Sequence, residues 1–359
     1  MVNPLAEDLD HILSHTEKIW KEFRNQHIFI TGGTGFFGCW LLESFAWAND
    51  KLGLNASVLV LTRNIEGFRK KAPHLAANPA IHFHVGHVEN FEFPVGHFSH
   101  VVHASNEAMN YVKDRNCQLM TNQMTDAAKH VLDFARLCGA KRFLFTSSGT
   151  VYGPQPPDMI RIPEDYMGSR NTQDFRFAHG EGKYRAETLC GKYSAQYNME
   201  AKIARCFSFL GPYMPLDEHY AIGNFIRDGI RGGPIRVEGD GTPVRSYLYA
   251  SDLVIWLLTI LAQGKSCEPY NVGSEVENDM RTVAMTVAKC FEPAREVRVA
   301  IEPTKGRPVE RYVPSTEKSR RELGLRPYVG ISEGIRKTVS WHEKRGGKRE
   351  NDPFKRRDT

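Results

Sequence analysis

The sequence contains no long apolar run and no closely spaced pair of cysteines. No stretch approaches the ~18 consecutive apolar residues that identify a membrane-spanning helix. The seven cysteines are scattered without a CxxC pair, which argues against a zinc site and against a dithiol redox motif. The first residues, MVNPLAEDLD, bring acidic side chains early and no apolar core, so we expect no signal peptide. These absences predict a cytoplasmic protein with reduced thiols that spans no membrane.

A strong excess of one charge is also missing. The 359 residues carry a formal net charge of +5, and much of the excess lies in the C-terminal stretch HEKRGGKRENDPFKRRDT. Residues 341–359 lack apolar periodicity and are predicted to form a disordered tail. The tail does not show the aromatic interleaving of nucleic-acid-binding segments, so we predict no nucleic-acid partner. The fourteen histidines show no convincing metal-ligand spacing, and we predict no metal site.

Short apolar segments alternate with helical patterns along the first 205 residues. The segments HIFIT, SVLVLT, IHFHV, HVVHAS, RFLFTSS and KIARCF are nearly continuous apolar runs, as expected for parallel strands that are buried on both faces. The pattern predicts a doubly wound parallel α/β (Rossmann) sheet over residues 26–205. An amphipathic helix over residues 5–23, within an N-terminal segment of residues 1–25, precedes it.

The composition of the sequence changes near residue 206. Prolines and glycines then punctuate short segments, which predicts a smaller C-terminal substrate lobe formed by residues 206–246 and 265–340. The intervening segment contains the strongly apolar run DLVIWLLTILAQG. We predict that this helix, within residues 247–264, packs back onto the first domain.

A glycine-rich turn follows the first predicted strand. The segment TGGTGFFG places Gly32, Gly35 and Gly38 in a G-x-x-G-x-x-G pattern before a helix. The first glycine allows a sharp turn, the second admits a pyrophosphate, and the third lets the helix lie against the sheet. The helix N-terminus, at Phe36 and Phe37, would direct N–H groups at the phosphates. We therefore predict a dinucleotide cofactor, NAD or NADP.

The residue after the second strand bears on the choice between these cofactors. An acidic residue there would bind the ribose 2′-hydroxyl of NAD. The strand ends instead in Thr62, Arg63 and Asn64, and the guanidinium of Arg63 suits the 2′-phosphate of NADP. An exposed arginine at a strand end is also common, so both cofactors stay open while the sequence favours NADP.

Several motifs occur in a fixed order between about residue 26 and residue 340. They are TGGTGFFG, VVHAS, FTSSGTVYG, a helix with a central lysine, RCFSFLGP and GDGTPVRSYLYASDL. With these motifs the chain resembles the extended short-chain dehydrogenases that act on nucleotide sugars, the NAD-dependent epimerase/dehydratase family. The motifs are specific for the family but not for the substrate. The resemblance implies an enzyme whose partner is a nucleotide-diphosphate sugar.

The resemblance also implies three catalytic residues. In the family a serine or threonine after the fifth strand binds the sugar oxygen, and Ser148 matches it. A tyrosine takes the hydroxyl proton, and a lysine four residues later binds the ribose hydroxyls of the cofactor and lowers the tyrosine pKa. Lys183 matches the lysine, but His179 stands at the tyrosine position, on the same face of the helix.

The chemistry of His179 leaves three interpretations open. Free histidine titrates near ~6.5, so a neutral imidazole is available as a base, and the charge of Lys183 favours that form. Imidazole is shorter than a phenol, so the substrate must lie closer or a water must bridge. The histidine is an adapted base, the mark of a weakened enzyme, or a sign that the base comes from elsewhere. Tyr152 and Tyr184 are near in sequence, but Tyr184 points about 100° around the helix from Lys183.

The residues after Ser148 bear on the reaction. In the 4,6-dehydratases of the family an acid pair follows the serine or threonine, whereas this chain has Gly149 and Thr150, which cannot protonate a leaving hydroxyl. We therefore predict reversible hydride transfer at the sugar, as in a C4 epimerase, a C4 dehydrogenase or a 4-keto reductase. The alternatives are a 4,6-dehydratase with an unusual acid, and a catalytically weakened NAD(P)-binding paralogue that acts as a sensor or partner.

Further binding residues follow from the resemblance. Candidates for the substrate site are Ser148, Gly149, Thr150, Ser208, Asn224, Arg245 and Arg307. Arg245 matches the arginine that clamps the nucleotide diphosphate, and bidentate guanidinium suits phosphate better than lysine does. Asn224 matches a diphosphate contact, and Ser208 stands where the family often has an asparagine beside the sugar.

The resemblance extends to the adenosine end of the cofactor and to assembly. His87 replaces an acid that commonly holds the adenine amino group, and Val88, Ala104 and Ser105 are further candidates for cofactor binding. Many family members dimerise through the helix that carries the lysine. On that helix Leu189, Tyr193 and Tyr197 have suitable spacing, so we expect a homodimer, although a buried core face shows the same stripe.

Overall fold

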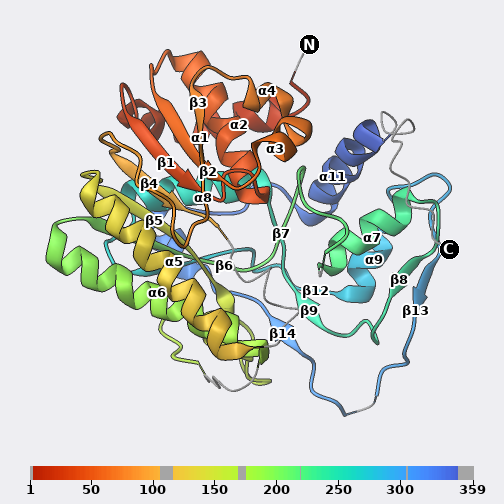
Figure 1. Cartoon of the computed structure of the whole chain (residues 1–359). Coiled ribbons are helices and arrows are strands. Elements are labelled where there is room, and N and C mark those ends of the chain that lie inside the picture. The colour runs from red at the N-terminus through yellow and green to blue at the C-terminus, as the bar shows by residue number, and fades with distance from the viewer. Residues whose placement is uncertain (1–2, 106–115, 169–174, 219, 305, 347–359) are drawn as a thin grey trace.

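The computed structural model describes residues 3–105, 116–168, 175–218, 220–304 and 306–346. The strands are β1 His27–Thr31, β2 Ser57–Thr62, β3 Ile81–Val85, β4 His100–His103, β5 Arg142–Ser148, β6 Glu200–Cys206, β7 Phe209–Leu210, β8 Ile235–Val237, β9 Val244–Arg245, β10 Leu248–Tyr249, β11 Pro269–Val272, β12 Asn278–Asp279, β13 Val297–Val299 and β14 Arg311–Tyr312. The helices are α1 Ala6–Glu22, α2 Phe36–Leu52, α3 Ile65–Lys71, α4 Pro73–Ala76, α5 Cys117–Leu137, the 3₁₀ helix η2 Gly149–Tyr152, α6 Phe175–Tyr197, α7 Ala221–Ile230, α8 Ala250–Gln263, α9 Met280–Ala288, α10 Glu317–Leu323 and α11 Ile331–Gly346. Figure 1 shows a large lobe around one sheet and a smaller lobe that contains α7, α9, β8 and β13.

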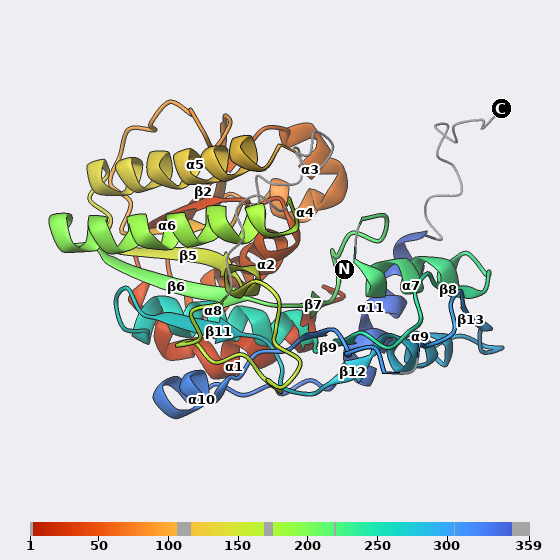
Figure 2. The ribbon, with the colours of Figure 1, turned by 90° about the horizontal axis from the view of Figure 1, so that it is seen from below.

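The large lobe is built on a seven-stranded parallel sheet in the order β11-β6-β5-β4-β1-β2-β3. Helices α5 and α6 lie on one face of this sheet, and α1 and α8 lie on the other (Figure 2). Because helices cover both faces, strand residues such as Phe29, Val58, Val101 and Phe143 are fully buried. The predicted doubly wound Rossmann fold is confirmed. The strand order reverses between β1 and β4, the switch point at which such sheets bind ligands.

Helices α1 and α8 cover the second face of the sheet. Helix α1 is amphipathic, as predicted, and buries Leu9, Ile12 and Trp20 where it packs against α2 and α8. Helix α8 is buried along most of its length because it lies against α1, α2 and the strands β5 and β6. Neither α8 nor any other helix in the described residues is both long and apolar enough to cross a membrane.

The smaller lobe brings distant segments of the chain together. Strand β9 lies between β12 and β14 in a three-stranded sheet, and Tyr312 on β14 lies opposite Arg245 on β9. Helices α7 and α9 pack against β8. Strand β11, in the segment assigned to the substrate lobe, joins the large sheet beside β6. The large sheet therefore takes in part of the sequence after residue 264.

The C-terminal helix reaches into the segment expected to be disordered. Residues 341–346 continue α11 to Gly346. The ring of Trp341 packs against Tyr213 at 4.7 Å between ring centres, and the guanidinium of Arg345 lies over Trp341. These contacts give the helix end an apolar partner from far along the chain, which local composition does not reveal. Residues 347–359, the remainder of the predicted tail, lie outside the described residues.

Candidate active site

The carboxyl edge of the sheet collects the candidate residues that follow its strands. Arg63 follows β2, His87 follows β3, Ala104 and Ser105 follow β4, and Ser148 ends β5. Parallel strands present their carboxyl ends at one edge, so residues far apart in sequence share one ligand-binding rim. Arg63 and His87 are exposed along this rim.

The glycine loop is shaped by close contacts at two positions. Gly32 has φ +71°, and a Cβ there would lie 2.5 Å from the carbonyl of Ala104. A Cβ on Gly38 would lie 2.3 Å from the carbonyl oxygen of Gly32, so any side chain would push α2 off the loop. Gly35 is exposed, and the nearest atom to a Cβ there is the Gly32 oxygen at 3.2 Å. A tight loop with an open outer face and a helix start fits the pyrophosphate of a dinucleotide.

Aromatic and basic side chains brace this loop. Phe36 and Phe37 contact each other edge to face, and Phe37 packs on Phe209 with ring centres 5.0 Å apart. Their side chains are therefore engaged in packing, and backbone N–H groups are what they would offer a phosphate. Lys71, at the end of α3, donates from Nζ to the carbonyl oxygen of Thr34 at 2.9 Å. This lysine places a positive charge beside the loop, and the sequence analysis missed it.

Lys183 lies in the interior of the site on α6. Only 4 % of it is exposed. Its Nζ donates to the carbonyl oxygens of Thr146 at 3.1 Å and Ser105 at 3.5 Å, which join it to the ends of β5 and β4. The ammonium also lies 4.9 Å from the ring centre of Phe145, a cation–π contact. These contacts fix the lysine between the carboxyl ends of β4 and β5, next to the switch point.

His179 is joined to Ser148 through Thr150. The Thr150 hydroxyl donates from Oγ1 to Ser148 Oγ at 2.9 Å and lies 2.9 Å from Nδ1 of His179. These two bonds connect Ser148 at the end of β5 with the imidazole on α6 through one hydroxyl.

The two glycines of HGEGK place the helix against its neighbours. A Cβ on Gly180 would lie 2.1 Å from the carbonyl oxygen of Thr150, and a Cβ on Gly182 would lie 3.0 Å from Met124 of α5. Helix α6 can therefore rest directly on the backbone of η2 only with glycine at position 180, and a side chain at position 182 would have to displace Met124. The close approach at Gly180 brings His179 within hydrogen-bonding distance of Thr150.

Burial and charge together keep the site histidines neutral. Burial, aided by the charge of Lys183, lowers the pKa of His179 from 6.5 to about 3. The same two causes lower the pKa of His103 to about 3, and its Nδ1 is bonded to the hydroxyl of Thr31 at 2.7 Å. Both imidazoles are therefore uncharged at neutral pH, with Lys183 as the cation between them.

The two tyrosines near Lys183 in sequence have other surroundings. The Tyr152 hydroxyl donates to Asn271 Oδ1 at 2.8 Å and accepts from Arg205 at 2.8 Å, and burial raises its pKa well above the usual range. Tyr184 packs against the buried cluster of Val151 and Tyr152. The structure thus places Tyr152 in a buried polar network instead of beside Ser148.

A different tyrosine, Tyr312, reaches Ser148 from the smaller lobe. Its ring packs on Phe207 with centres 4.7 Å apart, and burial raises the pKa of its hydroxyl above the usual range. A Cβ on Gly149 would lie 2.6 Å from the Tyr312 hydroxyl, so the phenol fills the space into which a side chain at position 149 would project. No local signal identifies Tyr312, because only the fold brings β14 to the end of β5.

The remaining substrate candidates lie along the smaller lobe. Arg245 is half-buried, forms an ion pair with Glu310, and also donates to the Val244 carbonyl at 3.0 Å. Asn224 on α7 accepts from Arg227 at 2.8 Å. Ser208 is half-buried between β6 and β7, and Arg307 is exposed. The structure brings Ser148, Thr150, His179 and Lys183 together. The residues of the smaller lobe (Ser208, Asn224, Arg245 and Arg307) stay candidates for binding the distal part of a substrate.

Two further predictions concern positions on the outside of the large lobe. Val88 is partly buried and packs against a hydrophobic cluster that includes Phe29, Phe91 and Val131. On α6, Tyr193 is buried and donates to Asp133 of α5 at 2.7 Å, whereas 45 % of Tyr197 is exposed. Tyr193, one of the residues expected at a dimer interface, therefore packs in the core of the subunit. The homodimer stays a prediction.

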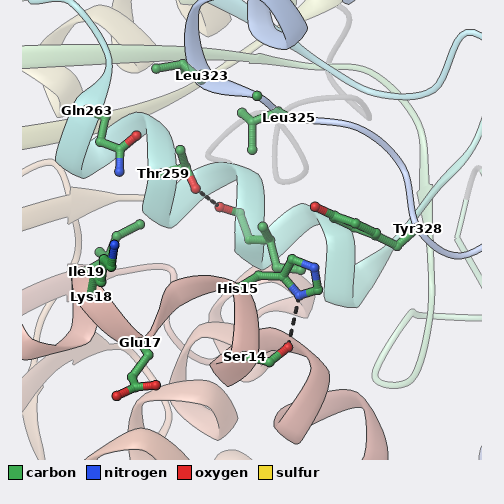
Figure 3. Close-up of a pocket in the computed structure, with 12 residues that line it drawn as sticks. Ser14, His15, Glu17, Lys18, Ile19, Thr259, Gln263, Leu323, Leu325 and Tyr328 are labelled. Atoms are coloured by element: carbon green, nitrogen blue, oxygen red, sulfur yellow. Dashed lines mark hydrogen bonds between the residues drawn. The ribbon is translucent and has the colours of Figure 1, made fainter.

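A pocket of about 420 Å³ lies apart from the candidate residues, between α1, α8 and the segment after α10 (Figure 3). Figure 3 shows the ring of His15 near that of Tyr328, and their centres are 4.2 Å apart. None of the candidate site residues lines this pocket. In the described residues no group of three or more His, Cys, Asp or Glu side chains could hold a metal ion.

Comparison with known proteins identifies the family to which this chain belongs. The model of the NAD dependent epimerase/dehydratase family matches residues 28–273. UDP-glucuronic acid decarboxylase 3 of Arabidopsis thaliana is 31 % identical over 313 residues, which are 87 % of this chain and 87 % of that protein. UDP-glucuronic acid decarboxylase 1 of the same plant is 30 % identical over 317 residues, 87 % of this chain and 69 % of that protein.

Solved structures share the fold at lower identity. UDP-glucose 4-epimerase of Thermotoga maritima, solved with UDP-glucose, superposes with a TM-score of 0.73 at 21 % identity and covers 89 % of this chain and 99 % of its own. The dTDP-glucose 4,6-dehydratase of Streptomyces venezuelae superposes with a TM-score of 0.74 at 24 % identity and covers 90 % and 99 %. The family match, the curated relatives and the shared fold lead to one conclusion: the chain belongs to the NAD dependent epimerase/dehydratase family and is an enzyme of that family.

Proposed function

We propose that the protein catalyses reversible hydride transfer at C4 of a nucleotide-diphosphate sugar, with Ser148, His179 and Lys183 as the catalytic residues. The observation that carries the proposal is the hydrogen-bonded chain from Ser148 through Thr150 to His179, beside the buried ammonium of Lys183. Burial and the charge of Lys183 keep the imidazole neutral, and a neutral imidazole can act as a base. Proton removal from an alcohol as hydride leaves needs a base of this kind.

Each residue has a defined task in this proposal. Ser148 binds the sugar oxygen, and the neutral imidazole of His179 takes the hydroxyl proton. Lys183 keeps His179 neutral before the reaction and binds the ribose of the cofactor. The bound nicotinamide would supply the hydride-accepting ring, held by the glycine loop at the start of α2. The fixed contacts of Lys183 and Thr150 mean that little reorganisation is needed during the reaction.

The residues around Ser148 favour redox chemistry over elimination of water. Gly149 and Thr150 carry no acid, and Tyr312 occupies the space beside Gly149. Oxidation at C4 gives a keto-sugar. Its reduction on the other face makes the protein an epimerase, and its release makes the protein a dehydrogenase. A reductase carries out the reverse step and reduces a 4-keto-sugar. A 4,6-dehydratase and a weakened cofactor-binding paralogue are the alternatives.

The curated relatives indicate which sugar to test first. They are UDP-glucuronic acid decarboxylases, and their identity to this chain is 30–31 % for the two described above. In a glucuronic acid a C4 ketone is β to the carboxylate on C5, and β-keto acids lose carbon dioxide without a separate acid catalyst. Chemistry of that kind would suit a site in which Gly149 and Thr150 stand at the positions of the acid pair.

The test uses the purified full-length protein with NAD or NADP and separate UDP-glucuronate, UDP-glucose, UDP-galactose and dTDP-glucose. Products are followed by proton NMR and by absorbance of the reduced nicotinamide. A product changed at C4, or a decarboxylated sugar, is expected with at least one substrate. A 4-keto-6-deoxy product would show the dehydratase instead. Tight cofactor binding by calorimetry with no turnover of any sugar, in wild type and in a His179→Tyr variant, would show the binding paralogue.

Arg245 is expected to bind the diphosphate of the substrate. Replacement by alanine should weaken UDP binding by about 10- to 100-fold, since a hydrogen bond to a charged group contributes ~1.5–3 kcal/mol. Replacement by lysine should give an intermediate loss because the charge stays but the bidentate geometry does not. Calorimetric titration with UDP measures both. Arg298→Ala, which removes an exposed ion pair with Glu296, is the matched control and should bind UDP normally. Normal UDP binding by Arg245→Ala would exclude this role.

We further propose that the enzyme prefers NADP to NAD, and the support is Arg63 at the end of β2. Arg63→Ser should raise the Kd for NADP by about 10- to 100-fold through loss of a charge-assisted bond to the 2′-phosphate. The Kd for NAD, which lacks that phosphate, should stay nearly constant. Fluorescence titration of each reduced cofactor measures the ratio. The control is Arg69→Ser, because Arg69 pairs with Glu66 on α3. An equal change for both cofactors would contradict the preference.

A further inference from the structure

The carbonyl of Thr34 in the glycine loop is bound by Lys71 of α3. The Lys71 Nζ donates to the Thr34 carbonyl oxygen at 2.9 Å, and the N–H of the same peptide, on Gly35, donates to the Gly32 carbonyl oxygen at 3.0 Å. The peptide between Thr34 and Gly35 is therefore fixed at both of its polar ends. Because Gly35 is the N-cap of α2, this peptide sets the direction in which the first N–H groups of the helix point.

Lys71 is itself bound by the C-terminal helix. The guanidinium of Arg345, in the last turn of α11, donates to the Lys71 carbonyl oxygen. This carbonyl lies at the C-terminal end of α3, where the last carbonyls of a helix need partners from outside it. The guanidinium also lies 4.5 Å from the ring centre of Trp341 and 5.6 Å from that of Tyr213, so two aromatic rings keep it in place.

Helix α11 comes to this site from the smaller lobe. It packs against α7 and α9 and against the short strands β7 and β10. Its last turn is separated by 274 positions in the sequence from the lysine that it binds. The glycine loop of the large lobe is thus connected, through Lys71 and Arg345, to a helix packed on the smaller lobe.

The charges in this cluster favour a role in shaping the loop over a role in attracting phosphate. The carboxylate of Glu43 on α2 is buried there and accepts from the hydroxyl of Tyr213, whose ring centre lies 6.0 Å from the Lys71 ammonium. Burial alone would raise the pKa of Glu43, but hydrogen bonds from His74 and Tyr213 lower it, so the carboxylate is charged at neutral pH. This negative charge offsets the attraction of Lys71 and Arg345 for an anion, whereas it leaves their hydrogen bonds intact.

We propose that Lys71 and Arg345 are positioning residues for the dinucleotide cofactor, and that α11 is thereby part of the cofactor site. Arg345 keeps the end of α3 in place, and Lys71 keeps the Thr34 peptide in the orientation in which α2 receives the pyrophosphate. A glycine-rich loop without these bonds samples other shapes, and a smaller population of the binding shape lowers the affinity. The proposal concerns binding of the cofactor and does not depend on the reaction at the sugar.

The test is fluorescence titration of the full-length protein with NADH and with NADPH, which share the pyrophosphate. Lys71→Met should raise the Kd of both cofactors about 10-fold, because the loop loses a charged donor. Arg345→Met, which acts through Lys71, should raise both by about 3-fold, and the double variant should bind no more weakly than Lys71→Met alone. The ratio of variant to wild-type Kd should be the same at low and high salt, since a lost attraction for phosphate would be screened by salt.

Lys70→Met and Lys344→Met are the matched controls, because each removes an exposed lysine next to Lys71 or Arg345. Both should bind the cofactors normally, and UDP should bind normally to every variant. An unchanged Kd in Lys71→Met would overturn the proposal, as would a double variant in which the two losses multiply. A parallel loss of UDP affinity would show a general defect of the fold and would also overturn it. Selective loss of cofactor affinity in a protein that turns over no sugar would uphold the proposal and count against the proposed function.

Discussion

Replacing Lys183 with methionine is expected to lower kcat by about 10²- to 10³-fold, the loss typical when one preorganised electrostatic group is removed. Methionine fills a similar volume and has no charge, so the packing on Phe145 is largely kept. The bonds from Nζ to the carbonyls of Thr146 and Ser105 are lost, and so is the group proposed to bind the cofactor ribose. Steady-state kinetics with the sugar that the substrate panel identifies, together with cofactor titration, measures both effects.

A second consequence of Lys183→Met concerns His179. The charge of Lys183 contributes to the lowered pKa of His179, after burial. Without it the folded-state pKa should rise, and the neutral form should be lost at a higher pH than in wild type. The acid limb of kcat/KM should therefore move to higher pH. Lys192→Met, on the exposed side of the same helix, is the control and should change neither kcat nor the limb. Wild-type kcat in Lys183→Met would exclude a catalytic role for the lysine.

Local sequence was enough to predict the cofactor loop and its sheet. Gly38 is needed for a contact within one strand-turn-helix unit, Gly32 has the positive φ of the turn, and the strands show their burial as continuous apolar runs. The position of His179 relative to Lys183 is likewise a matter of helical spacing. These features depend on neighbours within a few residues, which a single sequence displays.

Other parts of the site depend on contacts that only the folded chain creates. Tyr312 reaches Ser148 through the pairing of β14 with β9, and Lys71 reaches the glycine loop from the end of α3. Nothing in the residues around either position marks it. The two glycines of HGEGK could have been read as helix-weakening residues, yet Gly180 is what lets His179 approach Thr150. The sequence predicts that this segment carries catalytic residues, but only the packing of α6 on η2 explains its glycines.

Replacing His179 with alanine is expected to lower kcat by about 10²- to 10⁴-fold, the usual contribution of a general base. The variant keeps Gly180, Gly182 and the bond from Thr150 to Ser148, so the site should otherwise persist. Imidazole added to the buffer should restore part of the rate in proportion to its neutral form. Full activity in His179→Ala would show that the base comes from elsewhere.

The pH dependence separates an adapted histidine from a phenol at the same position. The pKa of His179 is lowered to about 3, and its active form is the neutral one, which is present above that value. The kcat/KM of wild type should therefore be nearly constant from about pH 5 to pH 8. A His179→Tyr variant needs its phenol ionised, and free tyrosine titrates near ~10, so its kcat/KM should increase with pH over this range. A wild-type profile that falls between pH 7 and pH 6 would mean that a histidine with an ordinary pKa limits the reaction. A His179→Tyr variant more active than wild type at every pH would identify the natural histidine as the mark of a weakened enzyme.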